Sequence, residues 1–284
     1  MTVLVTGATG NIGRHVVDCL VRRGGAPVRA LTRNPTSKRL PERVEAVSGD
    51  LTAPDTLGRA MAGVTAMHLI SIGGDDYAPL HTAEEVVARA VDAGVRRVTV
   101  LTGTEDELAV LEAVAASGLA WTHVRPVELM SNKLGWAESI RSEGVVRAPF
   151  AEQPHAIVDE ADVGAVVAAA LVEDGHSGRT YTPTGPQALT PVQAARVIGD
   201  AIGRDIRFVE LSPEQVREQM RASGLRDQVI DDVIAYGADP PQVAYTVLPT
   251  VRQVTGRPAH SFQQWVAEHA DAFRSASATA EGPR

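Results

Sequence analysis

Three glycines near the N-terminus have the spacing that a phosphate-binding turn requires. Gly7, Gly10 and Gly13 follow the apolar run Val3-Leu4-Val5 and precede an amphipathic helical pattern. Gly7 permits a sharp turn from strand to helix, Gly10 lets backbone N–H groups approach a pyrophosphate, and Gly13 lets the helix pack closely on the strand. The helix is expected to begin near Asn11, with its positive end directed at the phosphates. The stretch therefore predicts a dinucleotide site rather than a turn without a ligand.

The residue after the second apolar run indicates which dinucleotide is bound. An NAD-specific site usually carries a carboxylate there, which holds the ribose hydroxyls. In this chain the position is taken by Arg33, whose planar charged group suits a 2′-phosphate, and Lys38 adds a second positive charge nearby. The alternative is that Arg33 is a solvated surface residue. The pattern predicts NADP as the cofactor, with NADPH preferred over NADH.

These residues need a parallel sheet to bring them together. Apolar runs predict strands near residues 2–6, 27–32, 43–47, 65–70, 97–101 and 120–125, with helices between them. This alternation predicts an α/β fold with a Rossmann-type doubly wound parallel sheet. Later in the chain, Thr190 and Ser212 begin helices with capping signals. We expect a dinucleotide-binding domain over residues 1–125 and a smaller, mostly helical C-terminal substrate lobe over residues 126–284, of which about 156–185 pack back on the first domain.

Composition excludes several classes of function. The chain has 284 residues, is 44% hydrophobic and carries a formal net charge of −8. An acidic protein without a run of Lys and Arg is not expected to bind nucleic acid. The longest apolar stretches are too short to span a bilayer and the first strand begins at once, so we expect a cytoplasmic protein without a membrane segment or signal peptide. No cluster of His, Cys or carboxylates has metal-ligand spacing, so no metal is expected.

Several motifs together resemble one family. The Gly-x-x-Gly-x-x-Gly spacing, set between Val-Thr and Asn-Ile, resembles the short-chain dehydrogenase/reductase superfamily. Further landmarks are Leu31-Thr32-Arg33-Asn34-Pro35, Gly49-Asp50-Leu51, Leu119-Ala120-Trp121-Thr122-His123-Val124-Arg125-Pro126 and Val254-Thr255-Gly256-Arg257-Pro258. With these, nearly the whole chain resembles the NmrA-like atypical branch. The NmrA-like branch includes NADPH-dependent quinone reductases, enzymes that tailor natural products, and proteins that bind the dinucleotide and only sense it. The resemblance therefore implies one of these functions for this chain.

The cofactor site is expected to draw on several segments. Besides Arg33 and Lys38, its expected members are Gly7, Thr9, Gly10, Asn11, Ile12, Gly13, Asp50, Leu51, Ser71, Thr102, Pro126 and Val127. By resemblance, Asp50 contacts the adenine, although it is also placed to cap the following helix. The segment after the sixth strand, which includes Pro126 and Val127, packs against the nicotinamide in the family.

The chain departs from its superfamily in the proton donor. Short-chain enzymes use Tyr-x-x-x-Lys, in which the tyrosine donates a proton and the lysine lowers the tyrosine pKa. The two lysines of this chain, Lys38 and Lys133, have Asn34 and Leu129 four residues before them. Hydride transfer to a simple ketone gives an alkoxide whose conjugate acid has a pKa near ~16, whereas a quinone gives a phenolate with a value near ~10. That difference of roughly 6 units, about 8 kcal/mol, favours a quinone, enone or other conjugated acceptor.

Three residues are the candidates for catalysis. Thr102 ends the fifth strand, where the superfamily keeps Ser or Thr, and either bonds a substrate oxygen or its own backbone. Glu128 follows the sixth strand and either relays a proton or faces solvent. His155 either donates a proton or bonds the backbone of its loop.

The sequence as a whole predicts an NADPH-dependent oxidoreductase that passes hydride to a quinone, an enone or another conjugated carbonyl. Natural-product tailoring is one setting for such an enzyme. The alternative is a non-catalytic, NADP(H)-binding redox-sensing regulator of the NmrA type, which acts through a protein partner. The expected substrate is a small molecule, and the oligomeric state is left open.

Overall fold

The described chain divides into two compact units. The computed structural model describes residues 1–35, 40–74, 78–103 and 107–274. The first unit comprises Met1–Pro126, Glu160–Pro183 and Leu248–Pro258, and the second holds the remaining described residues. The predicted division at residue 125 differs from this arrangement, because residues 248–258 belong to the first unit instead of the C-terminal lobe. The reason is a short helix in that segment, which packs on a long apolar helix of the first unit.

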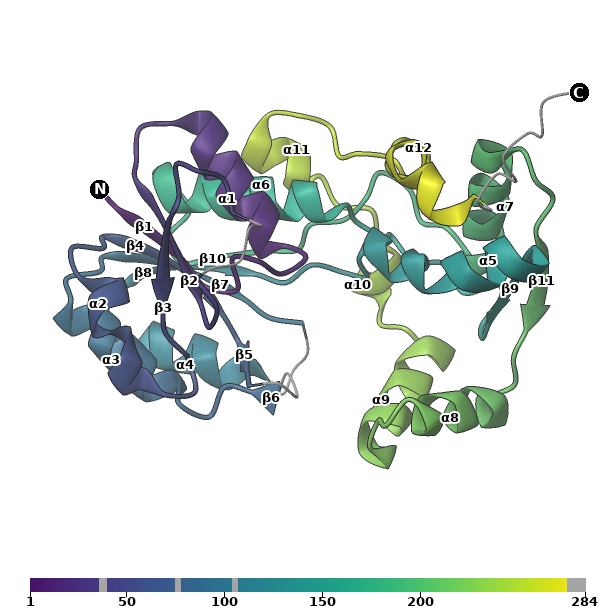
Figure 1. The fold of residues 1–284 in the computed structure, drawn as a ribbon, viewed down its shortest axis with the longest axis horizontal. Helices are drawn as coiled ribbons and strands as arrows, with labels where there is room; N and C mark the ends of the chain where they lie inside the picture. The colour runs from purple at the N-terminus through teal and green to yellow at the C-terminus, as the bar shows by residue number, and fades with distance from the viewer. Residues whose placement is uncertain (36–39, 75–77, 104–106, 275–284) are drawn as a thin grey trace, which may run out of the picture. The chain divides into compact units, whose positions relative to one another are not determined.

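A parallel sheet forms the centre of the first unit (Figure 1). Within the described residues it has seven strands, in the spatial order β10 (Arg179–Tyr181), β8 (Ala120–Val124), β7 (Arg97–Leu101), β4 (Ala66–Ile70), β1 (Val3–Val5), β2 (Val28–Thr32) and β3 (Glu45–Ser48). All neighbouring strands pair in parallel. The strand order reverses between β1 and β4, and ligands of such sheets bind at the carboxyl ends of the strands beside that point. The prediction of a doubly wound α/β fold is confirmed.

Helices cover both faces of this sheet. One face carries α1 (Gly13–Arg23) and α6 (Glu160–Val172), with α11 (Thr250–Thr255) packed on α6, and the other carries α2 (Gly58–Met61), α3 (Ala83–Asp92) and α4 (Leu108–Ala116) (Figure 1). A 3-10 helix, η1 (Pro54–Leu57), precedes α2, and β5 (Ile72–Gly73) pairs with β6 (Ala78–Pro79). Helix α6 approaches α1 so closely that a Cβ atom at Gly164 would lie 2.7 Å from the Cβ atom of His15. Buried Leu4, Met67 and Val98 join the core under α2, α3 and α4.

The second unit is mostly helical. It contains η3 (Met130–Trp136), α5 (Ala137–Glu143), α7 (Pro191–Ile202), α8 (Pro213–Ala222), α9 (Asp227–Ala238), α10 (Gln242–Tyr245) and α12 (Phe262–Phe273), with β9 (Val145–Ala148) parallel to β11 (Arg207–Glu210). Its core gathers Ile140, Ile198 and Phe262. The predicted N-cap at Thr190 and the predicted capping box at Ser212 are confirmed, because each side chain accepts a hydrogen bond from the backbone N–H three residues later. None of the described helices is long and apolar enough to cross a membrane.

Candidate dinucleotide and acceptor sites

The three glycines form a tight turn between β1 and α1, the glycine loop (residues 7–13). Gly7 has a φ of +59°, a conformation that favours glycine. A Cβ atom at Gly13 would lie 2.0 Å from the carbonyl oxygen of Gly7, so only glycine allows this approach of helix to strand. The N–H of Gly10 donates to the same carbonyl at 2.9 Å, and Gly10 itself is exposed. The loop therefore has the shape that a pyrophosphate requires.

The first turn of α1 also suits an anion. The helix begins at Gly13, two residues after the expected start at Asn11, and Ile12 is its N-cap residue. Within the described chain no side chain caps this helix, and no acidic residue occupies its first turn. Asn11 is exposed and Thr9 is half-buried on the same loop. The positive end of the helix dipole is thus not opposed by a local carboxylate, which fits the diphosphate of a dinucleotide.

Arg33 and Asp50 follow neighbouring strands, β2 and β3, on the far side of β1 from β4. The carboxylate of Asp50 accepts two hydrogen bonds from Thr52, from its N–H and its hydroxyl, each 2.8 Å long. The backbone hydrogen bond above all, with the charge of Arg33 as a smaller contribution, lowers the pKa of Asp50. Asp50 does not cap η1, which has no side-chain cap among the described residues. Leu51 is buried in the core, so only its backbone is available to a ligand, and Lys38 lies outside the described residues.

Hydroxyl groups lie at the carboxyl ends of β4 and β7. Ser71, which is 2% exposed, is within hydrogen-bond distance of the Leu101 carbonyl at 2.8 Å and also of the Glu107 carboxylate. Thr102 is 1% exposed and its Oγ1 lies 2.8 Å from Nε2 of His123 on β8. Burial, and then the charge of Arg125, lower the pKa of His123, which favours the neutral ring. Thr102 is therefore partnered by an imidazole, which neither of the two sequence-based alternatives included.

The end of β8 carries the remaining expected cofactor residues. The N–H of Arg125 donates to the Tyr181 carbonyl at 2.9 Å, which ties the end of β8 to β10. Pro126 is the last residue of the first unit in this segment and Val127 is the first of the second, and both are half-buried.

In the second unit the structure brings Glu128 and His155 together. A carboxylate oxygen of Glu128 accepts a hydrogen bond from Nζ of Lys133 at 2.6 Å, and its other oxygen lies 3.6 Å from Nδ1 of His155. Lys133 is buried and its Nζ lies 4.9 Å from the centre of the Trp136 ring. The rings of His155 and Tyr236, on α9, are 6.2 Å apart. We call Glu128, Lys133 and His155 the charged cluster.

The charged cluster favours a neutral imidazole. Burial is the main cause that lowers the pKa of His155, while Glu128 raises it and Lys133 lowers it further. Nδ1 of His155 is buried and has no hydrogen-bond partner among the described residues, and the backbone of His155 is hydrogen-bonded in both directions to that of Leu189. A proton on Nδ1 would have the Glu128 carboxylate as its nearest acceptor. The cluster can therefore hold or release a proton at this atom.

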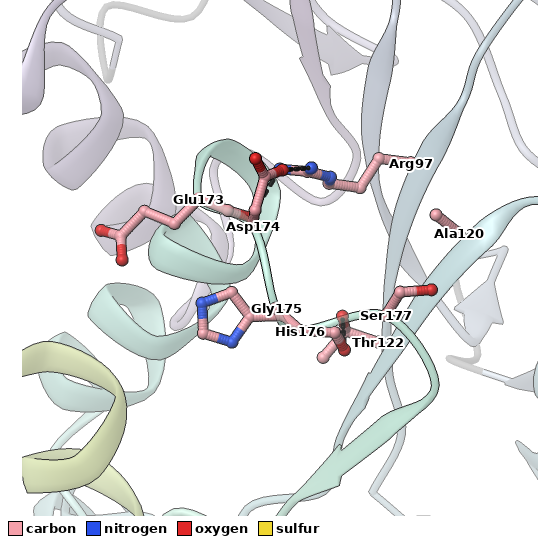
Figure 2. A pocket seen from close by; sticks show the side chains of 8 residues that line it. All are labelled: Arg97, Ala120, Thr122, Glu173, Asp174, Gly175, His176 and Ser177. Atoms are coloured by element: carbon pink, nitrogen blue, oxygen red, sulfur yellow. Dashed lines mark hydrogen bonds and ion pairs between the residues drawn. The ribbon is translucent and has the colours of Figure 1, made fainter.

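Figure 2 shows the residues that line a cavity at the amino ends of two strands of the sheet, whereas the glycine loop follows the carboxyl end of β1. The cavity has a volume of about 120 Å³ and is lined by the amino ends of β7 and β8 and by the segment after α6. The guanidinium of Arg97 bonds the Asp174 carboxylate at 2.5 Å and the Glu173 carbonyl at 2.6 Å, and so anchors this segment (Figure 2). Dinucleotides bind at the carboxyl ends of such strands, so this cavity is not the cofactor site. In the described chain, no three His, Cys, Asp or Glu side chains are grouped to hold a metal ion.

Three polar residues at these sites were not predicted from the sequence. Glu107 precedes a helix without belonging to a motif, and His123 lies in an apolar strand. Lys133 was considered only as a member of Tyr-x-x-x-Lys, since the sequence does not indicate that its ammonium group is buried. Only His123 had a signal that sequence analysis could have used. It lies in the strand next to the one that ends just before Thr102.

Comparison with known proteins agrees with this geometry. The family described as NAD(P)H-binding matches residues 7–174. The chain is 40% identical to the (4-alkanoyl-5-oxo-2,5-dihydrofuran-3-yl)methyl phosphate reductase of Streptomyces griseus, over 95% of this chain and 99% of that protein. The fold is similar to that of an NADPH-dependent quinone oxidoreductase from Escherichia coli solved with NADPH, with a TM-score of 0.81 and 23% identity over 94% and 99% of the two chains.

The NmrA resemblance is confirmed at the level of the fold. NmrA, a negative transcriptional regulator solved with NAD, superposes with a TM-score of 0.75 at 16% identity, over 94% of both chains. The family match covers more than half of this chain, and it includes the glycine loop and all the sheet strands except β1 and β10. The chain therefore belongs to the NAD(P)H-binding family of oxidoreductases, and it has the fold of the NmrA-like proteins that its motifs resemble.

Proposed function

We propose that this protein is an NADPH-dependent reductase of conjugated carbonyl compounds, with unsaturated lactones that carry an acyl group as the first candidates. The observation that carries the proposal is the absence of Tyr-x-x-x-Lys from a chain whose cofactor loop is otherwise complete. Hydroxyls from Ser71 and Thr102 lie at the carboxyl ends of β4 and β7, where the superfamily would add a tyrosine and a lysine. Such a site suits an acceptor whose product anion is already stabilised.

The chemistry of the Streptomyces griseus relative supports this class of acceptor. The compound in its name contains a ring C=C bond conjugated to two carbonyl groups, one in the lactone and one in the alkanoyl group. A bound NADPH would supply a hydride, and its addition at the ring carbon that carries the phosphomethyl group would move the electron pair into an enolate spread over both carbonyls. A proton then completes the reduction of the C=C bond. Because the enolate is delocalised, its formation demands less of a proton donor than an alkoxide does.

The residues proposed for proton transfer lie in the charged cluster. Glu128 is partly exposed, with 23% of its side chain accessible, so water reaches its carboxylate. Lys133 donates a hydrogen bond to this carboxylate. Burial lowers the pKa of His155, and its neutral ring can take up a proton on one nitrogen while it releases one from the other. Thr102 is the proposed hydrogen-bond donor to an acceptor oxygen, with His123 as its support.

Single-turnover kinetics test the proposal. We expect stoichiometric protein to oxidise NADPH rapidly when it is mixed with an acyl-substituted unsaturated lactone or a small quinone, and far more slowly with an unconjugated ketone. Stopped-flow absorbance at the reduced nicotinamide band measures this difference. If confirmed NADPH binding gives no oxidation with any conjugated acceptor, the reductase proposal fails. A changed affinity for a partner protein between NADPH and NADP⁺ would then favour the redox-sensing regulator.

Arg33 is proposed to select NADPH over NADH by binding the 2′-phosphate. Loss of a charge-assisted hydrogen bond should weaken NADPH binding by about tenfold to a hundredfold in Arg33→Ala and leave NADH binding unchanged. Calorimetric titration with both cofactors measures the ratio. Arg43→Ala is a matched control, because Arg43 is another exposed arginine close to β3. If Arg33→Ala discriminates as well as the parent protein, Arg33 is not the group that binds the phosphate.

A further inference from the structure

A carboxylate lies at the carboxyl ends of β4 and β7, where the sequence predicted none. Oε2 of Glu107 accepts a hydrogen bond from the Gly103 N–H at 2.7 Å and another from the hydroxyl of Ser71. Ser71 directly follows β4 and Gly103 follows the end of β7, so both donors belong to the edge of the sheet. Glu107 is half-buried, whereas Ser71 is 2% exposed. The carboxylate is therefore held in one position by two donors from neighbouring strands.

Ser71, one of the two donors to this carboxylate, directly follows a residue that packs against the glycine loop. A Cβ atom at Gly7 would come within 3.0 Å of Cδ1 of Ile70, so the loop packs against the residue that immediately precedes Ser71. The strand order reverses between β1 and β4, and a dinucleotide crosses such a sheet there, with one nucleotide on each side. Arg33 and Asp50 lie on the β2 and β3 side, which receives the adenosine. Glu107 lies on the β4 and β7 side, which receives the nicotinamide nucleotide.

We propose that Glu107 binds the hydroxyls of the nicotinamide-side ribose, with Ser71 and Gly103 as its supports. A sugar diol presents two O–H donors, and an ionised carboxylate is the side chain that accepts both with charge-assisted hydrogen bonds. Dinucleotide sites commonly use a carboxylate in this way for the adenosine ribose. In this chain Arg33 occupies that position, and Glu107 places a carboxylate on the other half of the site. The proposal concerns cofactor binding and does not depend on the identity of the acceptor.

Cofactor fragments test it directly. Adenosine 2′,5′-bisphosphate has the adenosine half of NADPH but lacks the second ribose. For Glu107→Ala we expect about ten- to a hundredfold weaker binding of NADPH and NADP⁺, and unchanged binding of the bisphosphate. Glu107→Gln should lose less, because its amide keeps one acceptor oxygen. Isothermal titration measures all three ligands, and Glu112→Gln is the control, since Glu112 is an exposed glutamate on α4.

Two results would overturn the proposal. If Glu107→Ala binds NADPH as tightly as the parent, Glu107 does not contact the cofactor. If NADPH and the bisphosphate weaken equally, Glu107 only maintains the fold of its loop. Because no turnover is measured, either result is separate from a failure of the proposed reductase activity.

Discussion

Gly10→Val is expected to fold like the parent protein and to lose measurable binding of NADPH. Gly10 is exposed, and the nearest atom to a Cβ there would be the Gly7 carbonyl oxygen at 3.2 Å, so a small shift accommodates the side chain. The branched side chain would then fill the space through which the loop N–H groups reach the pyrophosphate. We expect at least a hundredfold loss in calorimetric titration, equivalent to about 3 kcal/mol or more.

Two other glycines make this result specific. Gly58→Ala is the matched control, because nothing lies within 4 Å of a Cβ atom there, at the start of α2, and cofactor binding should be unchanged. Gly13→Ala should instead reduce the stability of the protein, because its Cβ atom would collide with the backbone of Gly7. Unchanged NADPH affinity in a folded Gly10→Val variant would contradict the placement of the pyrophosphate on the glycine loop.

The second large effect is a loss of stability in acid caused by His68. The ring is fully buried in β4, and burial lowers its pKa to about 4 from the ordinary value of 6.5. Nδ1 is 2.9 Å from the Thr99 hydroxyl, whereas Nε2 has no hydrogen-bond partner among the described residues. A second proton would therefore create a buried charge with an N–H that lacks an acceptor.

The sign of the effect follows from the lowered pKa. The unfolded chain takes up a proton on His68 below about pH 6.5, while the folded protein does so only near pH 4, so acid favours unfolding over this window. The contribution of neutral His68 to the free energy of unfolding is fully present above pH 6.5. Below that pH it falls by about 1.4 kcal/mol per pH unit, for a total loss of about 3 kcal/mol near pH 4. Urea unfolding at several pH values measures this loss.

Variants isolate the contribution of His68 from the carboxylates that also titrate. The double variant His68→Val with Thr99→Val removes both partners of the hydrogen bond, so no buried polar group is left without one. Between pH 7 and pH 4 the free energy of unfolding of the parent should fall by about 3 kcal/mol more than that of the double variant. The exposed residue His81 provides the control His81→Gln, which should keep the parent's pH dependence. If the free energy of unfolding of the double variant falls with pH as steeply as that of the parent, protonation of His68 does not destabilise the folded protein.

The sequence predicted the first unit well because its signals are local. Each predicted strand of the first domain lies within two residues of an observed one, since runs such as that before Gly7 are apolar on both faces of a buried parallel strand. The glycine spacing and the capping boxes are also local patterns. Glu107 and Lys133 were different, because their roles depend on partners at the ends of other strands or within a folded core. The sequence carries no signal that a single charged residue of this kind is buried.

The second unit was predicted less completely for a related reason. Strands β9 and β11 have four residues each, alternate weakly in burial and are separated by almost 60 residues, so neither has the pattern of a strand on its own. The segment 248–258 was assigned to the wrong unit for the same kind of reason. Its helix α11 is short, and only its packing against α6 determines where it belongs.

The division of the first unit into three segments has a consequence for biosynthesis. Helix α6 and strand β10 come from Glu160–Pro183, and α11 comes from Leu248–Pro258, so the central sheet is complete only after residue 181 has been made and the whole unit only after residue 258. Domains that are continuous in sequence can fold one after another as they leave the ribosome. This chain cannot finish its first unit in that way, because a nascent chain that ends at residue 126 lacks the helix that covers α1. A ribosome-stalled series of increasing length should gain protease resistance late, once these last segments have emerged.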